Sequence, residues 1–160
     1  MSGDGPDVTC DLSANENPSP PSPHVVAAIV DAVARLNRYP DREDDLLREA
    51  VARRLGRGVT PAHIVSGSSG SDALELCARA LLGPGDEAIV SPPTFTVYAP
   101  TIRHQRATVV EVPLVRESLA LDVDAILAAV TPKTRLVYVC NPGNPTGVAV
   151  PAQAFDALLA

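Results

Sequence analysis

The residues best suited to chemistry lie in one loop, 141–147, which reads Asn-Pro-Gly-Asn-Pro-Thr-Gly. The apolar run 136–140 precedes it, and a run that stops in Asn, Pro and Gly predicts a buried strand followed by a rigid turn. Open α/β sheets bind ligands at such carboxyl ends. The two prolines restrict the backbone, the glycines permit close approach, and two asparagine amides remain as polar groups for a ligand. An ordinary loop would explain each dipeptide alone, but the whole run predicts a binding site.

A second loop with chemical potential is 66–72, which reads Ser-Gly-Ser-Ser-Gly-Ser-Asp. It stands between a short expected strand, 64–65, and an apolar helix expected over 73–82. Free N–H groups at the start of that helix, together with small hydroxyls, could bind a phosphate. The loop lacks the Gly-Lys-Ser/Thr of a Walker motif and does not match G-x-G-x-x-G. The alternative is a serine-rich loop in which Ser71 or Asp72 caps the helix.

The elements that position these loops follow from hydrophobic periodicity. The first 23 residues are a proline-rich extended arm, and from there helices and strands succeed one another. Strands separated by helices of this length predict an α/β fold with a mostly parallel sheet and helices on both faces. We expect helices over 22–37, 41–55, 73–82, 95–103, 122–130 and from 151 onward, and strands over 64–65, 88–90, 108–112 and 135–140.

Composition excludes several classes of function. The 160 residues carry a net charge of -6, and the arginines are scattered, so no basic surface for nucleic acid is expected. No apolar stretch is long enough to span a membrane and the first residues do not form a signal peptide, which predicts a cytoplasmic protein. The three cysteines lack C-x-x-C spacing, so neither a disulfide framework nor a metal site is indicated. We expect Cys77 and Cys140 to be buried thiols.

The loop 141–147 resembles the Asn-Pro-x-Asn-Pro-Thr-Gly signature of fold-type I aminotransferases, which use pyridoxal 5′-phosphate (PLP). Three further segments, 12–18, 37–40 and 91–95, look most like histidinol-phosphate aminotransferases. The resemblance runs from residue 12 to the last residue and covers only the first part of such an enzyme. It implies the PLP-dependent transferase fold with an incomplete large domain. The implied divisions are an extended arm (1–23), a helical segment of the small domain or linker (24–58), and the first half of the PLP-binding large domain, truncated in a helix (59–160).

The resemblance also implies roles for individual residues. The PLP phosphate would be held at the start of the helix after the serine-rich loop, and Asn144 would hydrogen-bond the 3′-oxygen of the cofactor. Phe95 would stack on the pyridine ring, whereas Tyr98 and Asn141 are expected to be structural, and the Asn144-Pro145 peptide is expected to be cis. Tyr39 would reach the phosphate of a neighbouring subunit in a homodimer. The cofactor-binding residues expected are therefore Ser69, Gly70, Ser71, Asp72, Phe95, Asn144 and Tyr39.

A catalytic lysine is missing from this set. PLP enzymes bind the cofactor through a lysine amine, and the one lysine here, Lys133, stands in a polar turn before a strand, at the opposite end of the sheet from the motif loops. The resemblance places the family's lysine beyond Ala160, so these residues alone are expected to be inactive. The whole enzyme would transfer an amino group between an amino acid and a keto acid, as in the histidinol-phosphate/2-oxoglutarate reaction. Alternatives are a PLP-dependent O-phosphothreonine decarboxylase and a non-catalytic half-domain that binds PLP or phosphate.

Overall fold

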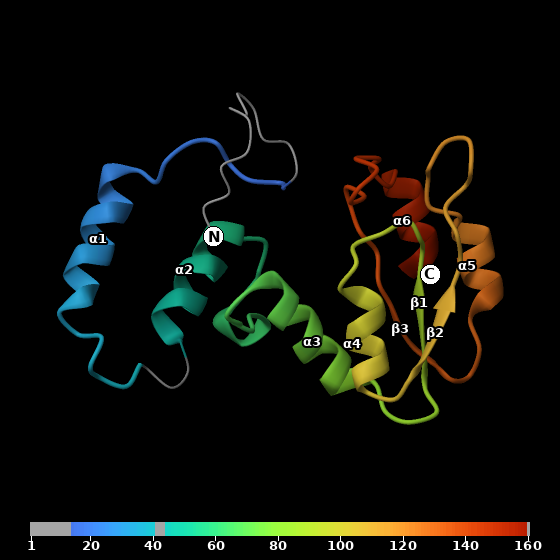
Figure 1. Ribbon diagram of the computed structural model, residues 1–160, viewed down its shortest axis with the longest axis horizontal. Coiled ribbons are helices and arrows are strands. Elements are labelled where there is room, and N and C mark those ends of the chain that lie inside the picture. Colours follow the sequence, from blue (N-terminus) through green and yellow to red (C-terminus); the bar gives the residue numbers. More distant parts are fainter. Residues whose placement is uncertain (1–13, 41–43, 160) are drawn as a thin grey trace, which may run out of the picture. The chain divides into compact units, whose positions relative to one another are not determined.

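The computed structural model describes residues 14–40 and 44–159, which fall into two compact units, 1–45 and 46–160 (Figure 1). In the first unit, helix α1 (Pro23–Val33) begins as predicted. The hydroxyl of Ser22 accepts a hydrogen bond from the N–H of Val25 at 3.4 Å, and Pro23 occupies the first turn. Most of the predicted arm, residues 1–13, lies outside the described residues.

Helix α2 (Asp45–Leu55) begins at the boundary with the second unit. The prediction of a helix from residue 41 is wrong at Asp44, whose φ of 50° is outside the right-handed helical region. Residues 41–43 themselves are outside the described part of the chain. A short 3-10 helix, η1 (Pro61–His63), and helix α3 (Gly70–Leu81) follow.

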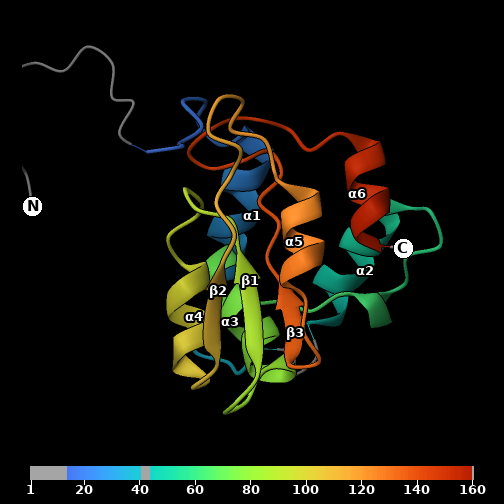
Figure 2. The ribbon, with the colours of Figure 1, turned by 90° about the vertical axis from the view of Figure 1, so that its right-hand side faces the viewer.

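The second unit is built on a sheet of three parallel strands in the order β2-β1-β3 (Figure 2). The strands are β1 (Glu87–Val90), β2 (Thr108–Glu111) and β3 (Thr134–Val137). Ile89 of the central strand stands between Val110 and Val137. The predicted strand at 64–65 is wrong. The backbone at Ile64 is extended, but no strand of the described residues pairs with it, and an extended segment becomes a strand only by pairing.

Helices cover both faces of the sheet, as predicted. Ala88 and Val90 pack with residues of α3 and of α4 (Tyr98–His104). Ile89 points to the other face and packs with residues of α5 (Val123–Ala129) and α6 (Ala152–Leu159). Ala88, Ile89 and Val90 are almost completely buried, which is typical of a central parallel strand. No helix within the described ranges is both long and apolar enough to cross a membrane.

Adjacent strands send the chain to opposite faces. After β1 the chain enters α4 on one face, whereas after the neighbouring β3 it enters α6 on the other. Figure 1 shows the two connecting segments rising from the same end of the sheet. Such a divergence is a topological switch point, where α/β sheets leave a crevice for a ligand. The fold therefore places the segment after β1 and the loop after β3 side by side.

Candidate functional site

A cavity of about 520 Å³ lies at this switch point. Phe95, from the segment after β1, and Asn144, from the loop after β3, both line it. Val90 and Ala99 add apolar surface, and Glu111 at the end of β2 adds a carboxylate. The volume is in the range of small-molecule sites, about 300–1,000 Å³. Two residues that are 49 positions apart in the sequence and were predicted to contact the same ring therefore share one cavity.

The loop that carries Asn144 is held by hydrogen bonds to the residues that flank it. The side-chain oxygen of Asn141 accepts from the N–H of Val150 at 2.9 Å, so Asn141 is structural, as predicted. The N–H of Gly143 donates to the carbonyl of Val148 at 2.8 Å. The sulfur of Cys140 accepts the N–H of Asn144 at 3.3 Å. Only the last of these bonds involves Asn144, through its backbone N–H. The Asn144-Pro145 peptide is cis, as expected.

The start of α3 has the arrangement expected of an anion site. The hydroxyl of Ser69 accepts the N–H of Asp72 at 3.1 Å, so Ser69 is the N-cap, and the alternative with Ser71 or Asp72 in that position is wrong. Helical geometry supplies no acceptor for the next N–H groups, those of Gly70 and Ser71. Ser69, Gly70 and Ser71 are exposed. Their polar groups can therefore meet a phosphate from solvent.

The carboxylate of Asp72 is turned back into the serine-rich loop. Its Oδ2 accepts the N–H of Ser68 at 2.9 Å and the hydroxyl of Ser68 at 3.1 Å. The backbone of Gly67 also passes close to this oxygen, because a Cβ at that position would lie 2.9 Å from it. Asp72 therefore shapes the loop through its side chain.

Phe95 is half-buried and contacts the core beneath the cavity. Its ring meets that of Tyr98 edge to face, with centroids 5.8 Å apart. Tyr98 is itself buried and stacks on Tyr138, with centroids 4.4 Å apart and an interplanar angle of 9°. Tyr98 is thus structural, as predicted. Burial, followed by the neighbouring Cys140 thiol, raises the pKa of Tyr98 to about 12, because the phenolate would be poorly solvated.

Lys133 and Tyr39 are the remaining residues singled out by sequence. The carbonyl of Lys133 accepts the N–H of Glu87, which begins β1, at 2.9 Å. Lys133 is therefore at the amino-terminal edge of the parallel sheet, opposite the cavity, as predicted. Tyr39 lies in the first unit and is fully exposed. Its role remains a prediction.

Two residues at the cavity were not predicted from the sequence, and one thiol differs from its prediction. Glu111 and Thr94 line the cavity, and the available signal was that Glu111 ends a strand and Thr94 follows one. Cys140 is half-buried, but Cys77 is exposed, so its predicted burial is wrong. The fully buried residue at this turn of α3 is the adjacent Ala78, which points to the sheet. Among the described residues, no group of three or more His, Cys, Asp or Glu side chains could hold a metal ion.

These residues fit a flat aromatic cofactor that bears a phosphate. The cavity offers an aromatic ring and an amide, and the start of α3 offers N–H groups and hydroxyls for an anion. Tyr138, one residue after β3, donates its hydroxyl to the carbonyl of Leu74 at 2.9 Å. The first half of α3 therefore lies beside the carboxyl ends of the strands, at the same end of the sheet as the cavity.

Comparison with known proteins finds relatives along nearly the whole of this chain. A family model described as aminotransferase class I and II matches residues 8–160. Histidinol-phosphate aminotransferase of Rhodopseudomonas palustris (strain HaA2) is 46% identical over 140 residues, which are 88% of this chain and 37% of the relative. The enzyme of the same name from Dinoroseobacter shibae is 41% identical, over 97% of this chain and 42% of the relative. The chain thus spans about two fifths of the length of these relatives.

Solved structures of aminotransferases also match this chain. Histidinol-phosphate aminotransferase from Sinorhizobium meliloti, in complex with pyridoxal-5′-phosphate, matches with a TM-score of 0.78 and 30% identity, over 87% of this chain and 37% of that one. A tetra mutant of Thermus thermophilus aspartate aminotransferase matches with a TM-score of 0.84 and 33% identity, over 92% of this chain and 42% of that one. The described residues therefore have the fold of the corresponding part of these enzymes.

The buried tyrosine pair predicts an alkaline loss of stability. A phenol whose pKa is raised to about 12 in the folded state keeps its proton more tightly than it does in the unfolded state, where the pKa is 10.0. Its contribution to stability is complete below pH 10 and is lost as the pH rises to 12. In urea denaturation between pH 9 and 12, we expect the midpoint of Tyr98→Phe to fall less steeply with pH than that of the wild type.

Tyr39→Phe, which removes an exposed phenol, serves as the matched control and should follow the wild type. Equal slopes for all three proteins would contradict the assignment.

Proposed function

The chain belongs to the class I and II aminotransferases, and we propose that it supplies the cofactor-holding part of a PLP-dependent aminotransferase of the histidinol-phosphate/2-oxoglutarate type. The observation that carries this proposal is the cavity at the switch point, which both Phe95 and Asn144 line. The relatives named histidinol-phosphate aminotransferase support the substrate class. Because the chain spans about two fifths of their length, the activity is proposed for the protein in its complete form.

Each residue has a distinct task in this proposal. PLP, when bound, supplies the electron sink for chemistry at the substrate Cα. The N–H groups of Gly70 and Ser71 and the hydroxyl of Ser71 would hold its phosphate, with Ser69 and Asp72 fixing the turn that presents them. Phe95 would cover one face of the ring. Asn144 would donate its amide N–H to the 3′-oxygen, which orients the ring in its plane.

The amine that binds PLP covalently is not proposed for Lys133. This lysine is at the amino-terminal edge of the sheet, and the cavity is at the carboxyl edge. We propose that a lysine outside residues 1–160 supplies the amine. We also propose a homodimer in which Tyr39, fully exposed in the first unit, contacts the phosphate bound by the neighbouring chain.

Cofactor binding tests the assignment of Asn144. We expect Asn144→Ala to weaken PLP binding about 10- to 100-fold, since a hydrogen bond to a charged oxygen contributes about 1.5–3 kcal/mol. Phe95→Leu should weaken it about 2- to 10-fold through the lost stacking of rings. Lys133→Ala is the control and should bind like the wild type in an absorbance titration. A loss of binding in the Lys133 variant, or none in the Asn144 variant, would contradict the placement of the site.

Activity is tested on the intact polypeptide from its native source, whose mass is measured first and compared with 16.7 kDa. We expect glutamate to form from histidinol phosphate and 2-oxoglutarate in the presence of PLP. Release of CO₂ from O-phosphothreonine would instead identify a decarboxylase. Tight PLP binding without either reaction would indicate a non-catalytic binding protein.

A mixing experiment tests whether two chains share a site. Tyr39→Ala and Asn144→Ala are each expected to have low activity. When the two variants are co-expressed, half of the dimers are hybrids with one intact site each, so about a quarter of wild-type activity should return. Phe95→Ala with Asn144→Ala is the matched control, because both residues line the cavity of one chain and no hybrid has an intact site. Equal recovery in the two mixtures would exclude a shared site.

A further inference from the structure

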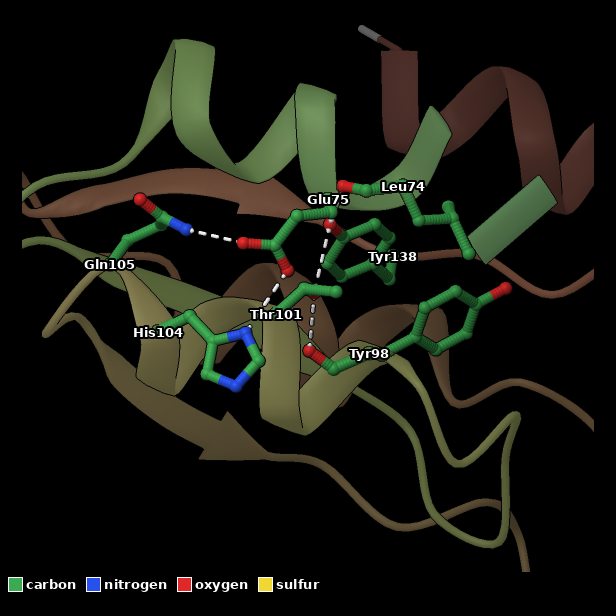
Figure 3. Close-up of polar contacts among 7 residues, drawn as sticks. All are labelled: Leu74, Glu75, Tyr98, Thr101, His104, Gln105 and Tyr138. Carbon is green, nitrogen blue, oxygen red and sulfur yellow. Dashed lines mark hydrogen bonds and ion pairs between the residues drawn. The ribbon is translucent and has the colours of Figure 1, made fainter. Parts of the chain in front are cut away.

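Tyr138 connects β3, α3 and α4, the three elements that contain or adjoin the proposed cofactor contacts. It follows β3 directly, and its ring stacks on Tyr98 of α4. Its hydroxyl donates to the carbonyl of Leu74 in α3 at 2.9 Å and lies 3.3 Å from the hydroxyl of Thr101 in α4 (Figure 3). Tyr98 and Tyr138 are each 7% exposed, so these contacts are sheltered from solvent.

Each of these elements leads to a different part of the site. Leu74 is in the second turn of α3, whose first turn is the proposed phosphate site. Tyr98 contacts Phe95 edge to face. Two residues after Tyr138, the sulfur of Cys140 accepts the N–H of Asn144. Tyr138 is therefore linked through Leu74 to the proposed phosphate site, through Tyr98 to Phe95, and through Cys140 to the backbone of Asn144.

The contact with Leu74 sets the position of α3 relative to the strand. The Leu74 carbonyl is already an acceptor within its helix, for the N–H four residues on, and its second lone pair takes the Tyr138 hydroxyl. This hydrogen bond forms only when α3 lies at one position along the strand, because hydrogen bonds tolerate little change in distance and angle. A rotation of α3 away from the sheet would break this hydrogen bond and leave the buried phenol with only the longer contact to Thr101.

A second polar link joins α3 to α4 without involving the strand. Glu75 accepts from Gln105 at 2.9 Å and pairs with His104 at 3.2 Å. Figure 3 shows this group beside the contacts of Tyr138, and the side chains of Glu75 and His104 are partly exposed. The two links therefore have different consequences. The Glu75 group ties helix to helix, whereas Tyr138 ties the helix to the strand that leads to Asn144.

We propose that Tyr138 is a positioning residue that fixes the separation between the phosphate-binding start of α3 and the Asn144 loop. This inference rests on the proposed function. A rigid cofactor held at both ends gains both interactions in full only if the two sites are held at the matching distance. A ligand that uses only one of the sites gains nothing from that distance.

The test compares ligands that use one site or both. In the complete protein, dissociation constants are measured for PLP, for pyridoxal, which lacks the phosphate, and for inorganic phosphate. We expect Tyr138→Phe, which keeps the ring and its stacking, to bind PLP about fivefold more weakly, corresponding to about 1 kcal/mol for one hydrogen bond. Binding of pyridoxal and of phosphate should not change, so the ratio of the pyridoxal constant to the PLP constant falls fivefold. Both aldehydes can react with the same amine, so a covalent contribution cancels in this ratio.

Gln105→Ala is the matched control. It removes a hydrogen bond of the same 2.9 Å length between α3 and α4, but none to the strand. It should lower the melting temperature and leave the ratio at the wild-type value. A ratio unchanged in Tyr138→Phe, with tight PLP binding by the wild type, would overturn the positioning role alone. Failure of the wild type to bind PLP would overturn the proposed function, and the positioning role with it.

Discussion

The structure depends on the burial of one short strand on both faces. Ala88, Ile89 and Val90 of β1 are at most 3% exposed, and β1 also pairs along both edges, with β2 and β3. The side chains of these three residues have almost no contact with water, so helices must cover both faces of the sheet. Alternation of side chains along β1 divides the interior into two cores, one with α3 and α4 and the other with α5 and α6.

The position of the site follows from that requirement. Because both faces need helices, the chain must leave neighbouring strands in opposite directions at some point along the sheet. This happens between β1 and β3, and the cavity lies there. The loop that carries Asn144 is held by hydrogen bonds to the side-chain oxygen of Asn141 and to the sulfur of Cys140. A loop supported in this way presents Asn144 without needing a ligand to order it.

The aromatic residues join core and site in a chain that has very few of them. Two phenylalanines and three tyrosines are present, and three of these five form one continuous group, Phe95, Tyr98 and Tyr138. Phe95 stands at the cavity, and Tyr98 and Tyr138 lie beneath it. The same stacked pair thus contributes to the stability of the α3/α4 core and sets where Phe95 lies. Stability and site geometry are coupled through these rings.

The sequence by itself determined the type and order of nearly all elements, the cap of α1, the structural role of Asn141 and the family. These depend on neighbours within a few positions, where periodicity, proline, glycine and side-chain hydrogen bonds act directly. The same local signals placed Phe95 and Asn144 at the ends of strands, and adjacent strands brought them into one cavity. Only the tertiary structure decided what depends on distant partners. It paired 64–65 with no strand of the described residues, turned Cys77 to solvent, and joined Tyr138 to Leu74, 64 positions away. No local pattern encodes such a contact, because it arises only when the helix packs on the sheet.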